Sequence, residues 1–418
     1  MTVRVKRGFP LVIDVMSIKP LIWSKLKRGA CFLATALIIL TLVTSCSLPQ
    51  ISAQQRVFLD LSLEFLGEYQ LPNSQFKDTP VGGLSGLTYD RQRNLFYAIA
   101  DDRSQLAPAR FYTLKLILDG SSKDKIGIEK VAVENVTFLR DAQGNTYPKN
   151  TSDTEGIALT PQQTVFISSE GVAENRVPPF IKEFALNTGR EQQSLTIPER
   201  YIPDDSAEQP RGIQNNLGFE ALTLNPTGTV PAKGEPFRLF TLTESALVQD
   251  EDPVASTNQT ETPQGAKCRL LHYLLSDGAP IIISEHLYQL EPPPSGAVKH
   301  GLPEILALDQ GGHFLTLERS FGLLGFNAKI FQAATGGATD TSRIASLKGG
   351  LRGIEPIKKK LLFDLDKLGV YLDNLEGMAL GPRLPDGSQS LLLVSDNNFN
   401  DSQITQFLLF RIKSGSHS

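Results

Sequence analysis

Short apolar runs that end at an acidic residue recur along the chain and predict β-hairpins. Each run begins after a small or acidic pair, turns at Pro, Gly or Asp, and returns as a second apolar strand. Five segments have this pattern: 83–103, 153–171, 218–245, 301–320 and 374–398. Their second strands end at Asp101, Glu170, Glu244, Glu318 and Asp396.

The first strands of these hairpins begin at a nearly even period. Counting through Ser85, Glu155, Glu220, Glu304 and Glu376, the spacings are 70, 65, 84 and 72 residues. Strand pairs repeated in this way are typical of a β-propeller. The period leaves room for long loops or a blade without the motif, so we expect an all-β fold, a β-propeller of five or six blades.

Other segments complete this expected fold. Apolar runs at 110–118 and 268–275 predict strands that follow a hairpin. The terminal runs 56–70 and 404–412 should pair in one sheet, because such closure protects exposed edges. Residues 361–370 predict a short helix, and the polar stretch 251–267 predicts a mobile insertion.

The N-terminus has a different composition. Lys25, Lys27 and Arg28 precede the apolar run 30–43, which has the length of a secretory h-region and is short for a membrane-spanning helix. Small residues then lead to Cys46, as in the lipobox of bacterial lipoproteins, where the cysteine is lipidated. An uncleaved signal anchor is the alternative. We expect export to the cell envelope, as a membrane-anchored lipoprotein or a periplasmic protein. The expected divisions are a signal peptide 1–45, a linker 46–56, a propeller domain 57–413 and a disordered tail 414–418.

The net charge of the mature chain limits the classes of partner that it is expected to bind. Without residues 1–45 it has 34 Lys and Arg against 44 Asp and Glu, a formal charge near −10. This argues against nucleic acid and is compatible with cation binding or with a solvated acidic surface. Cys268 is alone in the mature chain, which excludes a disulfide framework.

The hairpin geometry predicts an acidic ring. The start of a first strand lies beside the end of the second strand, so blade-lining hairpins would gather their acids at one mouth of the channel. So many like charges need compensating cations or arginines. The candidate metal ligands are therefore Asp101, Glu170, Glu244, Glu318 and Asp396. The alternative is that each glutamate accepts backbone N–H groups of a neighbouring blade.

The same residues carry a resemblance. The stretch 361–399, LLFDLDKLGVYLDNLEGMALGPRLPDGSQSLLLVSDNNF, resembles the family called esterase-like activity of phytase. LTYDRQRNLFYAIADDR, DTEGIAL, SSEG, GFEALTL and LTLERSFG match its pattern in order, and the resemblance covers residues 60–412. It implies a β-propeller common in bacterial envelopes and hydrolysis of phosphoesters.

Several common catalytic sites are absent from the sequence. It has no G-x-S-x-G elbow, no H-E-x-x-H and no Gly-rich phosphate loop ending in Lys-Ser/Thr, and its five histidines lack ligand spacing. Carboxylates clustered without histidine favour calcium, which would bind a phosphate ester and activate water. We assign Glu155, Glu220 and Glu376 as candidate catalytic residues. Arg103, Arg211 and Arg319 are candidate substrate-binding residues, each of which would otherwise pair with a ring carboxylate.

Two functions follow from these observations. One is an envelope-associated, calcium-dependent hydrolase of a small-molecule phosphoester. The other is a non-catalytic propeller that binds a ligand or a protein partner and uses its acids structurally. The sequence does not indicate an oligomeric state.

Overall fold

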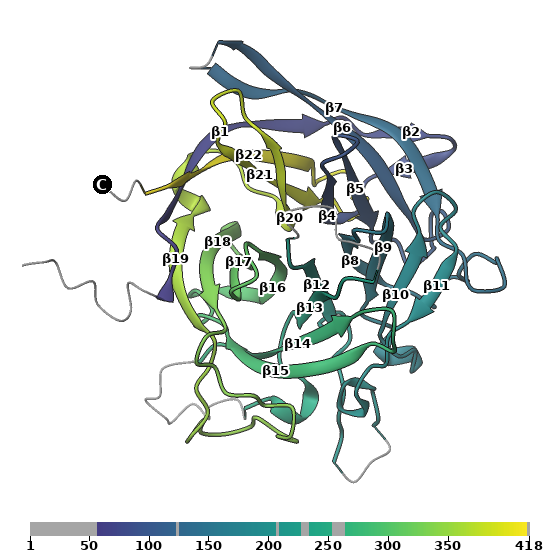
Figure 1. Cartoon of the computed structure of the whole chain (residues 1–418), viewed down its shortest axis with the longest axis vertical. Coiled ribbons are helices and arrows are strands. Elements are labelled where there is room, and N and C mark those ends of the chain that lie inside the picture. Colours follow the sequence, from purple (N-terminus) through teal and green to yellow (C-terminus); the bar gives the residue numbers. More distant parts are fainter. Residues whose placement is uncertain (1–56, 123–124, 206–208, 227–233, 253–263, 416–418) are drawn as a thin grey trace, which may run out of the picture. The chain divides into compact units, whose positions relative to one another are not determined.

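The computed structural model describes residues 57–122, 125–205, 209–226, 234–252 and 264–415. Within these residues, five four-stranded antiparallel sheets stand around a central axis as the blades of a propeller (Figure 1). The predicted all-β propeller is therefore confirmed, with five blades. The described part of the chain has no α-helix, and none of its helices is long and apolar enough to cross a membrane.

The strands follow the order of the chain within each blade. Blade 1 contains β4 (Leu84–Asp90), β5 (Leu95–Ala100), β6 (Arg110–Ser122) and β7 (Lys125–Phe138). Blade 2 contains β8 (Thr154–Leu159), β9 (Thr164–Ser169), β10 (Phe180–Ala185) and β11 (Glu191–Ser194). Blade 3 contains β12 (Phe219–Leu224), β13 (Phe237–Thr243), β14 (Lys267–Leu275) and β15 (Ile281–Gln289).

Blades 4 and 5 complete the ring. Blade 4 contains β16 (Ala297–Ala307), β17 (His313–Gly322), β18 (Gly325–Ala334) and β19 (Lys358–Asp364). Blade 5 contains β20 (Asn374–Arg383), β21 (Gln389–Asp396), β22 (Thr405–Ser414) and, as its outermost strand, β1 (Leu61–Leu71). A separate two-stranded sheet contains β2 (Ser74–Phe76) and β3 (Thr79–Val81). Four short 3-10 helices lie in the connections: Ala173–Asn175, Glu199–Tyr201, Val248–Asp250 and Leu365–Leu368.

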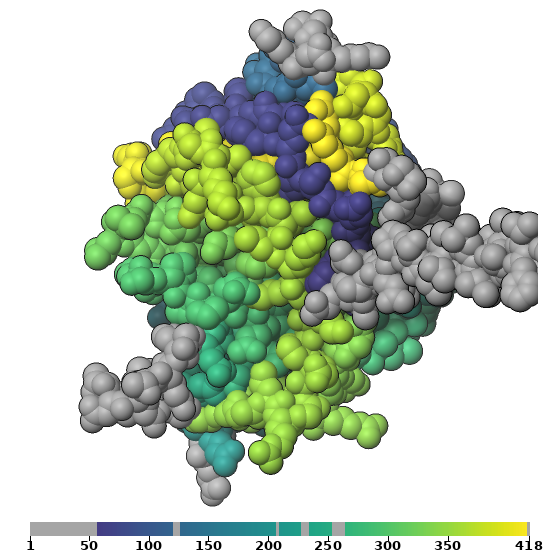
Figure 2. All heavy atoms as spheres, turned by 90° about the vertical axis from the view of Figure 1, so that its left-hand side faces the viewer, coloured from purple at the N-terminus to yellow at the C-terminus, as the bar shows by residue number. Residues whose placement is uncertain are grey.

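The pairing of the first and last strands closes the propeller. β1 runs antiparallel to β22, with Leu61 opposite Ser414 and Leu71 opposite Thr405. The space-filling view shows the N-terminal strand, in purple, against the C-terminal strand, in yellow (Figure 2). The predicted pairing of the terminal strands is confirmed, and it removes an exposed edge from both segments.

Apolar side chains form a separate cluster between each pair of neighbouring blades. Ile99 of blade 1, for example, packs in one cluster with Ile157 and Val165 of blade 2. The other four clusters lie between blades 2 and 3, 3 and 4, 4 and 5, and 5 and 1. Sheets that are apolar on both faces and pack face to face in this way leave the inner strand edges around the axis.

One expected element differs from the structure, and several expected segments lie outside the described residues. The helix expected over 361–370 is wrong for its first half: β19 continues to Asp364 and a 3-10 turn covers Leu365–Leu368. Lys359, Lys360 and Leu361 pair with β18, so tertiary pairing overrides local propensity. The expected signal 1–45 with Cys46, the linker 46–56, most of the insertion 251–267 and the tail beyond Gly415 lie outside the described residues.

Candidate functional site

Acidic side chains gather at one mouth of the central channel. The first strands β8, β12 and β20 contribute one glutamate each near their starts, the ends of β5, β9, β13 and β21 contribute one acid each, and Asp153 lies immediately before β8. We call this group the acidic ring: Asp101, Asp153, Glu155, Glu170, Glu220, Glu244, Glu376 and Asp396. All are buried except Asp101, which is partly exposed. Their charges act on one another around the ring.

A backbone irregularity aims the first-strand glutamates at the axis. The register with the second strand shifts between Phe219 and Ala221 and between Leu375 and Gly377, so Glu220 and Glu376 stand on β-bulges. A shift between Thr154 and Ile157 does the same for Glu155. A bulge turns a side chain away from the regular alternation, which directs these carboxylates into the mouth.

The glycine that follows the glutamate has a packing role. A Cβ on Gly156 would lie 2.5 Å from Leu222 Cβ and 2.9 Å from the carbonyl oxygen of Glu220. Neighbouring inner strands therefore come too close there for a side chain. The recurring Glu-Gly pair combines a side chain that faces the mouth with a residue that lets two inner strands meet.

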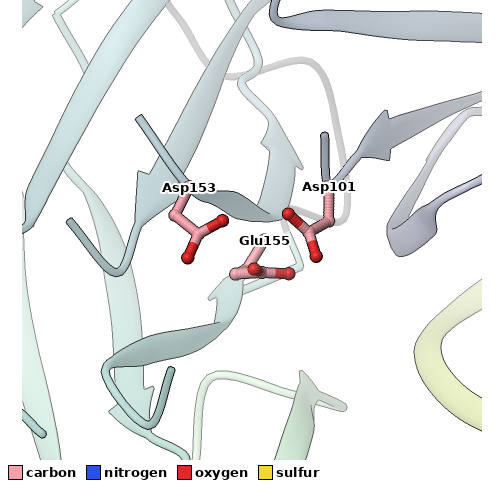
Figure 3. A group of neighbouring side chains, drawn as sticks. All are labelled: Asp101, Asp153 and Glu155. Carbon is pink, nitrogen blue, oxygen red and sulfur yellow. The ribbon is translucent and has the colours of Figure 1, made fainter. Parts of the chain in front are cut away.

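Two groups of carboxylates are spaced to share a cation. Oxygens of Asp101, Asp153 and Glu155 lie within 4.8 Å of one another, and so do oxygens of Glu155, Glu170 and Glu220. Figure 3 shows the first group, in which the three side chains point toward a common space. Glu155 belongs to both groups.

Buried oxygens in both groups lack hydrogen bonds. Oδ1 of the fully buried Asp153 accepts none, and Oε2 of Glu170 accepts none either. Oε1 of Glu170 accepts the backbone N–H of Gly218 at 2.5 Å. Because an unsatisfied buried carboxylate costs free energy, this pattern fits an oxygen-binding cation between the side chains.

Burial and mutual repulsion raise the pKa values of these groups. Burial raises the pKa of Glu155 well above its usual range, and the charges of Asp101 and Glu220 raise it further. Burial, then Asp153 and Asp396, raise the pKa of Asp101 in the same direction. The pKa values of Glu170 and Glu220 are also raised, first by burial and then by neighbouring carboxylates. A cation would reverse this effect, since it favours the ionised form.

Arg103 reaches the first group from the rim. Its Nη2 forms an ion pair with Oδ2 of Asp153 at 2.5 Å and donates to Oδ1 of Asn216 at 2.6 Å. This contact with Asp153 raises the pKa of Arg103 further above its usual range, so it stays charged. Arg103 and Ser104 have φ angles of 42° and 56°, a left-handed pair that costs backbone energy and is often found at functional sites.

Arg319 neutralises the opposite side of the ring. Its Nη1 donates to Glu376 at 2.5 Å and to Asn374, and its Nη2 donates to Glu244 at 2.8 Å. Asn374 also donates to Glu376 at 2.8 Å. Arg319 is thus an internal partner of two ring carboxylates, which is the alternative that the sequence left open for it.

Glu318 does not join the ring, contrary to our expectation of convergence. Its carboxylate accepts hydrogen bonds from Tyr288 at 2.9 Å and from Lys359 at 2.5 Å. In blade 4 the register places Arg319, not Glu318, at the position that faces the mouth. Arg211 likewise lies apart from the ring, in ion pairs with Glu199 and Asp204.

Two acids near the axis were missed or misplaced by the motif count. Asp153 was not predicted, because it lies in the loop immediately before β8, where strand alternation does not apply. Glu304 pairs with Leu317 in blade 4, as Gly377 pairs with Val394 in blade 5. Glu304 therefore corresponds to the residue after Glu376 and lies one residue further from the mouth than the ring. Glu304 accepts the backbone N–H of Ile305 at 2.9 Å and that of Met378 in blade 5 at 3.4 Å. It therefore has the structural role that the sequence left open for the glutamates, which is to accept backbone N–H groups of a neighbouring blade.

The other mouth of the channel holds a cavity of about 390 Å³. It is lined by the ends of the five inner strands, including Thr88, Leu159 and Thr223, and by turns such as 160–163. None of the ring carboxylates lines it. The cavity and the acidic ring are therefore separate features at opposite ends of the inner strands.

The chain was compared with known protein families and with curated proteins. A family model described as phytase-like, esterase-like activity of phytase, matches residues 79–399. A search of curated proteins found no match.

Solved structures with a similar arrangement are distant. The endo-arabinase of Bacteroides thetaiotaomicron is 11% identical with a TM-score of 0.40, over 82% of this chain and 99% of that one. The GH62 α-L-arabinofuranosidase catalytic domain of Coprinopsis cinerea is 11% identical with a TM-score of 0.35, over 84% and 97%. The N-terminal domain of Nup159 is 9% identical with a TM-score of 0.28, over 85% and 96%. Likenesses this distant say nothing about substrate or mechanism.

Proposed function

The chain belongs to the phytase-like family, described as having the esterase-like activity of phytase, and we propose that it is a calcium-dependent phosphoester hydrolase whose site is the acidic ring. The second candidate is a non-catalytic propeller that binds a ligand or partner at the same mouth. Both use the cation that the carboxylates are suited to hold. They differ in whether a bound phosphoester is cleaved.

One observation carries the cation part of the proposal. Asp153 is fully buried, its Oδ1 accepts no hydrogen bond, and its side chain points at Asp101 and Glu155. A structural acid at this depth would be satisfied by backbone or side-chain donors, as Glu304 is. A ligand position left open between oxygens is what a hard cation such as calcium requires.

The residues around this space have distinct proposed roles. Asp101, Asp153 and Glu155 would hold the cation, which supplies charge neutralisation for the ester and a more acidic bound water. Arg103 contacts Asp153 and Asn216 only through Nη2, which leaves its other N–H groups to bind a phosphate oxygen. Asp101 is the partly exposed member, so a substrate would approach from its side.

Among the ring glutamates, Glu220 would act on the attacking water. Glu220 belongs to the second carboxylate group and, when ionised, would accept a proton from water. Glu376 is already held by Arg319 and Asn374, so it would position Arg319 and shape the field at the mouth. Arg211, in its surface ion pairs, would contribute only if the substrate extends to that loop.

A direct assay tests the hydrolase. The purified protein should release phosphate from at least one member of a phosphomonoester panel with calcium and lose this activity with a chelator. Asp153→Asn should reduce the rate at least tenfold, while Asp250→Asn, a buried acid paired with Arg269 outside the ring, controls for losing a buried carboxylate. Calcium binding without cleavage of any ester would support the binding module instead.

We also propose that the protein is exported and held at the membrane by a lipid on Cys46. The support is the basic, apolar and small-residue order of segment 25–46. Intact-mass analysis of the membrane fraction should find a lipid on Cys46 and no residues 1–45. A Cys46→Ala variant that stays membrane-bound would contradict this proposal.

A further inference from the structure

We propose that the acidic ring is a two-cation site in which Glu155 bridges both ions and Arg319 takes the place of a third. The inference rests on the proposed cation dependence of the mouth and specifies how the charge is divided. One ion would lie between Asp101, Asp153 and Glu155, and the other between Glu155, Glu170 and Glu220.

The spacing fits two separate ligand sets. Oxygens bound to one calcium at about 2.3–2.6 Å can be at most about 5 Å apart. Both groups meet this limit, since their oxygens lie within 4.8 Å of one another. Because only Glu155 is common to the two groups, its carboxylate can bind one ion through each of its two oxygens, as in two-metal sites.

Each group has its own unsatisfied oxygen. In the first group it is Oδ1 of the fully buried Asp153, and in the second it is Oε2 of Glu170, which is 1% exposed. A single cation could satisfy one of these oxygens and would leave the other buried without a partner. Two independent gaps therefore indicate two ions.

Two divalent ions balance the charges when all five carboxylates are ionised. The five carboxylates of the two groups carry five negative charges when ionised. Arg103 offsets one of them through its ion pair with Asp153. Two divalent cations would offset the remaining four, which a single cation would not do in a buried site.

The opposite side of the ring is already compensated. Glu244 and Glu376 are bound by Arg319, whose guanidinium lies between them. Arg319 stands where the register of blades 3 and 5 places Glu244 and Asp396, so blade 4 supplies a cation of its own. Oδ1 of Asp396 accepts the N–H of Asn398 at 2.7 Å. No third cation position is expected there.

Calcium titration of the full chain by calorimetry measures the number of ions. The wild type should bind two calcium ions. Asp153→Asn and Glu220→Gln should each bind one, and Glu155→Gln should weaken both sites at least tenfold. Asp250→Asn, which removes a buried acid paired with Arg269 outside the ring, is the matched control and should still bind two. Thermal unfolding checks that each variant is folded.

Manganese provides a second readout that does not depend on activity. Mn²⁺ takes the same oxygen ligands, and two ions that share Glu155 should give an exchange-coupled electron paramagnetic resonance spectrum. Glu155→Gln should leave only isolated-ion signals. One calcium per wild-type chain, or uncoupled manganese at full occupancy, would overturn the bridged pair. Two ions without hydrolysis would keep this inference and reject the hydrolase, while one ion with hydrolysis would do the opposite.

Discussion

A one-residue difference in where blade 4 places its charged side chains decides which of them face the mouth. In blade 3, Ala221 follows the bulge and pairs with Leu242, and Glu244 lies two residues after Leu242. In blade 5, Gly377 pairs with Val394 in the same way, and Asp396 lies two residues after Val394. The same position in blade 4 is Arg319, because Leu317 opposes Glu304. Glu318 consequently faces Tyr288 and Lys359. The ring therefore has a buried arginine in blade 4 where blades 3 and 5 have acids.

Removing this arginine should be costly. Arg319→Met leaves Glu244 and Glu376 buried without a cation, and breaking a buried pair in this way costs about 3–5 kcal/mol of unfolding free energy. Urea unfolding of the variant measures the loss. Arg211→Met, which removes surface ion pairs, should lose no more than about 1 kcal/mol. Equal effects for the two variants would contradict the internal role of Arg319.

The sequence predicted most ring acids, and it offered pairing of Arg103 and Arg319 with ring carboxylates as one of two alternatives. Glu155, Glu220 and Glu376 follow from the motif, since each precedes a small residue and an apolar strand. The prediction for Glu318 was wrong because two adjacent charged residues, Glu318 and Arg319, cannot be assigned to a face of the strand without the register of β16 and β17. Asp153 was missed because an acid in a loop has no periodic pattern to identify it.

Inner strands that meet through glycine set the width of the channel neck. Gly156 of β8 lies against Glu220 and Leu222 of β12. Gly86 of β4 lies against Glu155, whose carbonyl oxygen would be 2.5 Å from a Cβ placed on that glycine. These contacts hold neighbouring carboxylates at cation-sharing distances. Spacing between elements, which strand propensity does not encode, therefore controls the site.

Widening this neck should destabilise the fold. In Gly156→Ala the new methyl group would meet Leu222 Cβ at 2.5 Å, and such overpacking costs about 1–3 kcal/mol. Gly127→Ala is the control, because a Cβ on Gly127 in β7 has no atom within 4 Å. Urea midpoints compare the two variants. A Gly156→Ala protein as stable as the control would show that the inner strands can separate freely.

At the scale of the whole propeller, residues 57–415 form a closed ring in the part of the chain that the structure describes, and the sequence predicted that closure from the terminal apolar runs. The hairpin repeats and the apolar terminal runs indicated a propeller with paired termini, and β1 and β22 have that pairing. The sequence did not distinguish five blades from six, because long connections such as 335–357 lengthen the repeat and could have belonged to a blade without the motif. Only three-dimensional packing distinguishes such connections from a blade.

The ring gives the molecule a pH dependence of defined sign. The raised pKa values of Glu155, Glu170 and Glu220 mean that the folded protein binds more protons than the unfolded chain. Without divalent cations, stability should be greatest below the unfolded pKa of about 4.3 and should fall as pH rises through the raised folded values. Thermal unfolding between about pH 4 and pH 8 in chelator measures this fall. Stability that rises over this range would contradict buried, uncompensated carboxylates.

The central claim, that the acidic ring holds calcium, is tested most directly by the melting temperature of the protein at about pH 8 as calcium is added. Binding to the folded state alone stabilises it by about 2.7 kcal/mol at a hundredfold excess over the dissociation constant. The melting temperature should therefore rise with calcium, and the double variant Asp153→Asn, Glu220→Gln, which removes one ligand from each carboxylate group, should abolish that rise. A wild-type melting temperature unchanged by calcium would contradict the claim and leave the ring to arginines and backbone donors.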